Sequence, residues 1–136
     1  MNKLQSLKAR HAELKNKTSV KDVGIKTKII DLLNTKNDKG EKMFNFSPSI
    51  IPTTPWKYSS DEDMRYYMWL CQVQKWLRDE YERYVHITPT VQRNSVEWTN
   101  NIDIRENISF NSFEEALESG IYQILTILIK NNGRNN

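Results

Sequence analysis

The spacing of apolar residues predicts two helices in the first part of the chain, over residues 2–16 and 20–34. The apolar positions of the first are Leu4, Leu7, His11 and Leu14, and those of the second are Val23, Ile29, Ile30 and Leu33. Lys and Arg residues lie between these apolar positions. The apolar seam of the first helix is too thin to be stable alone, so this helix should pack on another element.

The next segment reads as extended rather than helical. Residues 36–42 have the composition of a turn, and Met43–Phe46 could form a short strand. Prolines follow at positions 48, 52 and 55, a spacing that no helix interior tolerates. Residues 43–60 are therefore expected to lie extended over the surface, as a link between a basic N-terminal region and the rest.

A longer helix is expected from Ser60 to about Tyr84. Ser60 is a good N-cap, with Asp63 at the capping-box position, and capping explains the acidic residues there better than metal binding does. The apolar stripe comprises Tyr66, Leu70, Val73, Leu77 and Tyr84, widened by Trp69, Trp76 and Tyr81. These rings favour core packing.

Two segments with alternating apolar and polar residues follow this helix, as expected of half-buried strands. The apolar positions are Val85, Ile87 and Val91 in the first segment, and Val96 and Trp98 in the second. Pro89 has no N–H to donate, so the first strand should lie at a sheet edge or bulge there. Ile102, Ile104 and Ile108 could supply a third strand.

The last helix has the strongest pattern. Ser112 should cap it, with Glu115 completing the capping box. Its broad apolar face comprises Phe113, Ala116, Leu117, Ile121, Ile124, Leu125 and Leu128. A close approach of another element would explain Gly120 inside the helix. The expected fold is α+β: two N-terminal helices, an extended proline-containing segment, and an α-β-β-α body with a small antiparallel sheet, with or without a third strand.

The length of the chain predicts one structural domain, and the distribution of charge distinguishes regions within it. With 136 residues the chain fits a single domain. Residues 1–42 form a basic helical region of net charge +6, residues 43–60 the extended segment, and residues 61–136 the body. Residues 43–136 have a net charge of −3. Such a basic region indicates either an anionic partner or a solvated surface.

Most catalytic and cofactor chemistries find no support in the sequence. His11 and His86 lie in different segments, and Cys71 sits inside a predicted helix, so no metal-ligand spacing or nucleophile–base pair is evident. The four glycines form no phosphate-binding loop. No signal peptide or membrane-spanning run is expected. We therefore expect a cytoplasmic protein with no catalytic, cofactor or metal site.

Two motifs carry a resemblance. Trp76-Leu77-Arg78-Asp79-Glu80 lies near the end of one predicted helix, and SFEEALESGI, residues 112–121, opens the last one. The pairing resembles a group of small uncharacterised proteins from Bacteroides-type bacteria and their phages, in which a "WLRE" helix leads through a short β-region to a "(S/T)(Y/F)EEALEAG" helix. The group often has His at the position of Tyr81. The resemblance covers roughly residues 64–130 and implies this fold and a phage or mobile-element origin, but no activity.

Two functions remain in view. The first is a non-catalytic interaction or accessory protein that contacts a protein partner or forms a homo-oligomer, through aromatic residues including Trp56, Tyr58, Trp69 and Trp98. The second is a nucleic-acid-binding regulator or antitoxin-like protein that uses the basic region. Its contacts would be Lys3, Lys8, Arg10, Lys15, Lys17, Lys21, Lys26 and Lys28. Residues 1–42 contain no aromatic side chain on which bases could stack, so such binding should be weak and non-specific.

Overall fold

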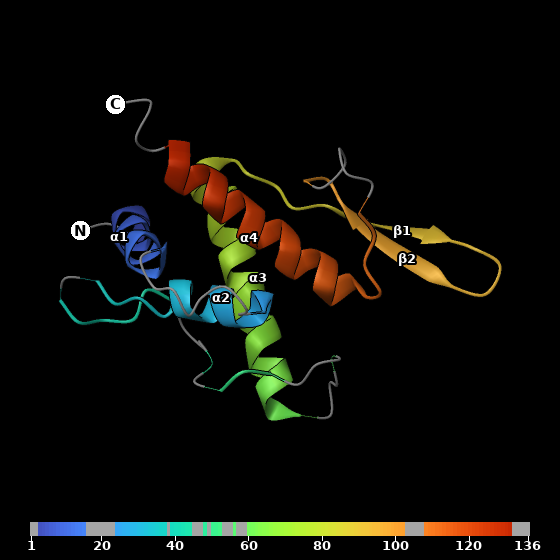
Figure 1. Ribbon diagram of the computed structural model, residues 1–136, viewed down its shortest axis with the longest axis horizontal. Helices are drawn as coiled ribbons and strands as arrows, with labels where there is room; N and C mark the ends of the chain where they lie inside the picture. Colours follow the sequence, from blue (N-terminus) through green and yellow to red (C-terminus); the bar gives the residue numbers. More distant parts are fainter. Residues whose placement is uncertain are drawn as a thin grey trace.

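The computed structural model describes residues 3–15, 24–37, 39–44, 48, 50–52, 56, 60–102 and 108–131. Over these residues the chain forms four helices and one antiparallel pair of strands, in the order α1 (Lys3–Lys15), α2 (Ile25–Leu33), α3 (Asp61–Tyr81), β1 (Ile87–Val91), β2 (Val96–Asn100) and α4 (Phe113–Asn131). The predicted α+β class and order of elements are confirmed. In Figure 1, α4 crosses α3 steeply, and the hairpin of β1 and β2 projects on the side away from α1.

Both predicted N-caps are present. The Ser60 Oγ accepts a hydrogen bond from the Asp63 N–H at 3.2 Å, and the Ser112 Oγ accepts one from the Glu115 N–H at 3.2 Å. These bonds satisfy backbone donors that have no partner within the first turn of α3 and of α4. Since capping depends only on neighbouring residues, it could be read directly from the sequence.

The end of α3 differs from the prediction. Glu82 adopts a left-handed conformation, with φ of 53°, and ends the helix after Tyr81. The N–H groups of Glu82 and Arg83 bond back to the carbonyls of Arg78 and Leu77, each at 3.1 Å. The expectation that Tyr84 belongs to the buried stripe of this helix is wrong, because Tyr84 lies beyond the turn and is 48% exposed.

One hydrophobic core joins all four of these helices. Its fully or almost fully buried members include Leu7 from α1, Ile29, Leu32 and Leu33 from α2, Tyr66, Trp69, Leu70, Val73 and Leu77 from α3, and Leu117, Ile121 and Leu125 from α4. Both α1 and α2 contact α4. The thin seam of α1 is therefore covered, as its pattern requires, and the N-terminal helices are part of the same packed unit as the body.

Part of the proline-containing segment, which was expected to lie over the surface, adds buried residues to this core. Met43 and Phe44 are buried, but they lie in a bend, so the predicted strand over residues 43–46 is wrong for its two described residues. The Phe44 ring meets the Trp76 ring edge to face, with centroids 5.4 Å apart. Pro48 and Pro52 are also buried. The described part of this segment therefore covers the helices.

The hairpin shows how Pro89 fits a strand. β1 and β2 pair antiparallel, with Pro89 opposite Trp98. In an antiparallel pair, every second residue of a strand forms backbone hydrogen bonds to the partner strand. The His86 carbonyl accepts a bond from the Asn101 N–H, and the Gln92 N–H donates one to the Ser95 carbonyl. Positions 88 and 90 therefore also direct their backbone groups toward β2, and position 89 directs its own away from it. The nitrogen of Pro89 therefore faces the open edge of the sheet, which confirms the edge-strand prediction.

No third strand forms among the described residues. Phe110 instead makes a single bridge to Trp98, with N···O distances of 2.9 and 2.7 Å, while Ile102 lies in a bend. Ile104 is outside the described residues. Neither Ile102 nor Ile108 lies in a strand, the predicted segment between them (residues 103–107) lies outside the described residues, and Phe110 supplies the only described pairing on that side of β2.

Gly120 allows α4 to approach the sheet closely, as its position in the pattern indicated. A Cβ at this position would lie 2.6 Å from Val85 Cγ1 and 3.5 Å from the Asn100 side chain. Asn100 is buried, and its Nδ2 donates to the Ala116 carbonyl at 2.9 Å. The end of β2 is thereby tied to the first half of α4.

We expect Gly120→Ala to destabilise the protein by about 1–2 kcal/mol, because the overlap with Val85 exceeds what the helix propensity of alanine returns. The unfolding free energy would be measured in urea. Adding Val85→Ala should recover part of the loss, because the smaller side chain makes room for the new methyl group. If the two changes in unfolding free energy simply add in the double variant, the overlap with Val85 is not the cause of the destabilisation by Gly120→Ala.

Candidate functional site

A buried polar cluster joins four parts of the chain. Glu118 of α4 is only 1% exposed, and it accepts hydrogen bonds from Trp56 Nε1 on Oε1 and from the Tyr66 hydroxyl on Oε2, both at 2.9 Å. The Nζ of Lys26, in α2, lies 3.8 Å from the centroid of the Trp56 ring and 5.3 Å from that of Tyr66. We call these four residues the Lys26–Glu118 cluster.

Burial and charge shift the pKa values in this cluster. Burial raises the pKa of Glu118, against the opposing effect of the Lys26 ammonium. Burial also lowers the pKa of Lys26, against Glu118 and Asp63. Both oxygens of Glu118 already accept hydrogen bonds, so this carboxyl is poorly placed as a general base. The cluster brings Lys26 of α2 against Trp56 and Tyr66, and both of these residues donate to Glu118 of α4.

Sequence reasoning missed this cluster. It assigned Lys26 to a nucleic-acid contact and did not place Glu118 in any site. A signal was present, since Glu118 follows Leu117 and precedes Ile121 on the apolar side of α4. A carboxyl at such a position needs buried partners. The identity of these partners could not be read from the periodicity.

The raised pKa of Glu118 predicts a pH dependence of stability. The folded chain binds more protons than the unfolded chain above the ordinary pKa of 4.5, so the contribution of Glu118 to stability falls as the pH rises from there through the folded-state pKa. Glu118→Gln removes this dependence, and below the ordinary pKa of 4.5 it costs about 1–3 kcal/mol through a lost acceptor. In urea unfolding from acid to neutral pH, wild type should therefore lose stability relative to Glu118→Gln. Glu41→Gln, an exposed carboxyl, is the control, and parallel curves for wild type and Glu118→Gln would contradict the prediction.

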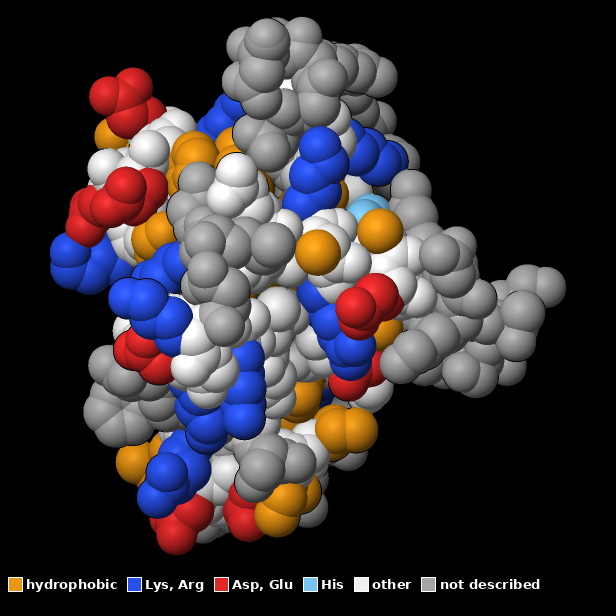
Figure 2. Space-filling view, turned by 90° about the vertical axis from the view of Figure 1, so that its left-hand side faces the viewer, with side chains coloured by type: hydrophobic (Ala, Val, Ile, Leu, Met, Phe, Trp, Pro, Cys, Tyr) orange, Lys and Arg blue, Asp and Glu red, His pale blue; other side chains and the backbone are white. Residues whose placement is uncertain are grey.

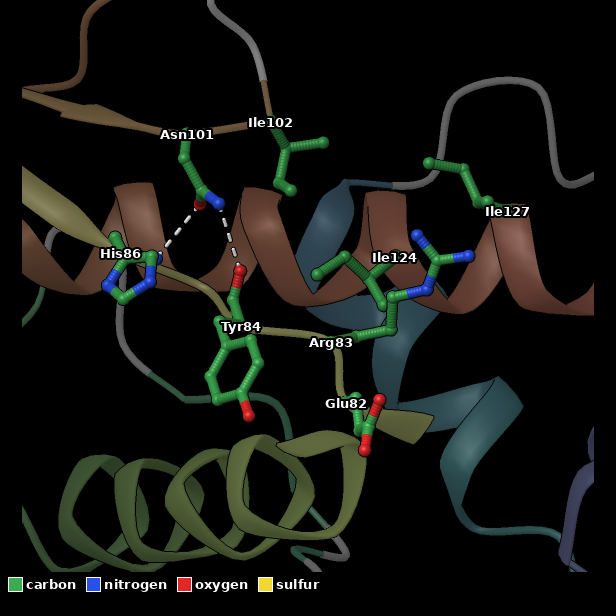
Figure 3. A pocket seen from close by; sticks show the side chains of 8 residues that line it. All are labelled: Glu82, Arg83, Tyr84, His86, Asn101, Ile102, Ile124 and Ile127. Carbon is green, nitrogen blue, oxygen red and sulfur yellow. Dashed lines mark hydrogen bonds between the residues drawn. The ribbon is translucent and has the colours of Figure 1, made fainter. Parts of the chain in front are cut away.

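The connection between α3 and β1, Glu82–His86, is held in place by two side-chain amides. Asn101 accepts a hydrogen bond from the His86 N–H at 2.9 Å and donates one to the Tyr84 carbonyl at 3.0 Å, as Figure 3 shows. From the other side, Gln74 Nε2 donates to the Val85 carbonyl at 3.1 Å. Although the connection is not regular secondary structure, several of its backbone N–H and C=O groups are hydrogen-bonded, which favours a defined conformation.

A hollow lies on each side of this connection. The first, of about 280 Å³, has a wall of Ile102, Ile124 and Ile127. Figure 3 shows the Arg83 side chain extending toward Ile124 and Ile127, while the Tyr84 ring points away from them, toward α3. The second, of about 260 Å³, is bounded by Gln74 and Arg78 of α3. Arg83, Tyr84 and His86 line both. The two rings of Tyr84 and His86 stack, with centroids 6.1 Å apart and planes at 15°.

The hairpin has two chemically different faces. Strand alternation and the register place Pro89, Val91, Val96 and Trp98 on one face, and Thr88, Thr90, Glu97 and Thr99 on the other. At its base the apolar face meets α4, where the Trp98 ring contacts Phe113 edge to face at 5.8 Å. Beyond α4 it is open, and Val91 is 77% and Val96 42% exposed.

Three of the predicted nucleic-acid contacts make contacts within the protein. Lys3 Nζ lies 4.5 Å from the centroid of Phe44, Arg10 donates to the Asp31 carbonyl at 3.1 Å and pairs with Glu13 at 2.9 Å, and Lys26 belongs to the buried cluster. Lys8 is exposed and Lys28 half-buried. The Lys15 side chain, Lys17 and Lys21 lie outside the described residues. Figure 2 shows Lys and Arg side chains along one face of the molecule, with Asp and Glu among them.

The predicted aromatic contacts also separate. Trp69 is fully buried, so its assignment to a protein contact on the surface is wrong. Trp56 is half-buried and turned toward Glu118. Trp98 is half-buried on the apolar face of the hairpin. Tyr58 lies outside the described residues. Of the described candidates, Trp98 is the one that adjoins an exposed apolar surface.

Among the described residues, no group of three or more His, Cys, Asp or Glu side chains is arranged to hold a metal ion. No described helix is long and apolar enough to cross a membrane. Cys71 is a free thiol, and burial together with this neighbouring thiol raises the pKa of Tyr67. No nucleophile–base pair is evident in the described hydrogen bonds.

Comparisons of the chain with protein-family models, with curated proteins and with solved structures find no match.

Proposed function

We propose that this chain is a non-catalytic interaction protein of the cytoplasm, of phage or mobile-element origin, which contacts a protein partner through the apolar face of its hairpin. The observation that carries the proposal is the exposure of Val91 and Val96 on the face shared with Pro89 and Trp98. The suggested origin rests on the resemblance of the helix motifs alone.

The shape of the hairpin supports binding through its face. An isolated two-stranded ribbon is only marginally stable in water. An apolar surface that such a ribbon exposes beyond the core gains no stabilisation from burial unless a partner covers it, and exposed apolar surfaces of this kind mark interaction sites. The apolar face carries no charged side chain. Pro89 interrupts the donors along the open edge of β1, which disfavours the addition of another strand there. The expected partner therefore offers an apolar groove that receives this face.

The test uses a photo-crosslinking residue at Val91 and, as a matched control, at Thr90 on the opposite face. A protein crosslinked from position 91 and not from position 90 would be purified and its affinity for the unmodified chain measured. Val96→Asp should weaken binding at least about tenfold, while Thr99→Asp on the polar face should not. Equal crosslinking from both positions, or equal affinity of both Asp variants, would contradict the proposal. Crosslinking to a second copy would assign the face to self-association.

The alternative, a nucleic-acid-binding regulator or antitoxin-like protein, has less support. Because Lys3, Arg10 and Lys26 make internal contacts, fewer free cations remain than the net charge suggests. We expect binding of duplex and single-stranded DNA or RNA to be weak and to fade between about 50 and 200 mM salt. Tight or sequence-selective binding at the higher salt would favour this alternative over the hairpin proposal.

A further inference from the structure

A third hollow lies between the start of α2 and the first half of α4, and we call it the α2–α4 hollow. Its volume is about 360 Å³, within the range of about 300–1,000 Å³ that small-molecule pockets occupy. None of its described lining residues borders the two hollows beside the α3–β1 connection. The described lining consists of Gly24–Thr27, Ile51, Phe110, Glu115, Glu118 and Ser119.

Three apolar side chains, those of Ile25, Ile51 and Phe110, border this hollow. Ile51 is 53% exposed, so an apolar ligand that covered it would bury surface that the fold leaves in water. Phe110 is half-buried, and its backbone is fixed by two hydrogen bonds to Trp98 at the edge of the hairpin. A ligand with an apolar body therefore gains most from this lining.

The charged residues of the lining differ in whether their polar atoms are already engaged. Lys26 and Glu118 are committed to the Lys26–Glu118 cluster, where the ammonium lies over an aromatic ring and both carboxylate oxygens accept hydrogen bonds. Glu115 is half-buried, and among the hydrogen bonds of the described residues it accepts one, on Oε2 from the Asn111 N–H at 3.3 Å. Its Oε1 is left to accept a bond from a ligand.

The charges around the hollow favour a cation over an anion. Burial lowers the pKa of Lys26 and raises that of Glu118, and the Glu115 carboxylate opposes the first shift and adds to the second. Even with Glu118 protonated, the described lining has one positive and one negative side chain, so it offers an anion no excess of positive charge. A ligand ammonium beside Glu115 would be attracted to this carboxylate, whereas a ligand carboxylate would be repelled.

We propose that the α2–α4 hollow binds a small primary amine with an apolar body. The body lies against Ile25, Ile51 and Phe110, and the ammonium group donates a charge-assisted hydrogen bond to Glu115 Oε1, which fixes the orientation of the ligand. This site uses different residues from the exposed tip of the hairpin, so neither proposal depends on the other.

The test is a calorimetric titration of the full chain at neutral pH and constant ionic strength with phenethylamine and with isoamylamine. Phenethyl alcohol, in which a hydroxyl replaces the ammonium group, and ethylamine, which lacks the apolar body, are the control ligands. We expect saturable binding of at least one of the two larger amines, about tenfold tighter than of either control. In nuclear magnetic resonance spectra, the amide signals of Ile25, Thr27 and Ser119 should shift with the same titration curve. Shifts confined to Val91 and Val96 would place the amine on the hairpin and overturn the proposal.

Glu115→Gln should weaken binding of the amine about tenfold and leave binding of phenethyl alcohol unchanged, because the variant removes the charge and keeps an acceptor. Glu114→Gln removes the neighbouring carboxylate, which does not border the hollow, and should bind as wild type does. Ile51→Ala should weaken binding of amine and alcohol alike, whereas Ile50→Ala, at the exposed neighbour, should weaken neither. Circular dichroism would establish that each variant is folded. The proposal is overturned if neither amine saturates the protein, if the alcohol binds as tightly as the amine, or if Glu114→Gln and Glu115→Gln lose affinity equally.

Discussion

A chain that begins at Glu41 is expected to lose its cooperative unfolding transition. It would lack Leu7, Ile29, Leu32 and Leu33, which are at most 1% exposed in the core. Burial of each such side chain stabilises the folded state by about 1.5–3 kcal/mol, and a domain of this size is stable by about 5–15 kcal/mol in total. The loss is therefore comparable to the whole stability. Circular dichroism during heating and urea titration would detect it.

A matched pair of substitutions in the full chain separates this explanation from a simple effect of shortening. Leu7→Asp puts a charge into the core and should abolish or severely weaken the transition, whereas Lys8→Asp changes an exposed neighbour and should not. A cooperative transition in the chain that begins at Glu41 would mean that the rest of the protein folds without α1 and α2.

Leu117→Ala and Ile121→Ala should each destabilise the protein by about 2–5 kcal/mol. Leu117 is 1% exposed and Ile121 is fully buried, and both belong to the core cluster. Truncation at these positions removes apolar contacts and leaves a cavity that the surrounding helices can fill only in part. Urea unfolding gives the difference in free energy directly.

Ile127→Ala is the control for these two core variants. Ile127 lies on the same helix but is 38% exposed, so its truncation should cost less than about 1 kcal/mol. Nearly unchanged stability of both core variants, or a cost at Ile127 as large as theirs, would show that the buried face of α4 is placed wrongly.

Local features of the chain were readable from the sequence alone. The caps at Ser60 and Ser112, the buried face of α4, the hairpin and the edge position of Pro89 all follow from residues close together in the chain. Helix and strand periodicity, capping and proline geometry depend on short-range sterics and hydrogen bonds. The close approach at Gly120 was also indicated, although the contact with Val85 was not.

Tertiary structure alone decided the features that carry the proposals. Lys26 and Glu118 look like surface charges in the sequence but meet at Trp56 and Tyr66, and Trp69 lies inside the core. The α2–α4 hollow is lined by residues from separate parts of the chain. Each of these outcomes depends on residues distant in sequence, which compete for burial and for hydrogen-bond partners only once the helices have packed. Periodicity indicates which face of an element is apolar, and packing decides which polar groups that face encloses.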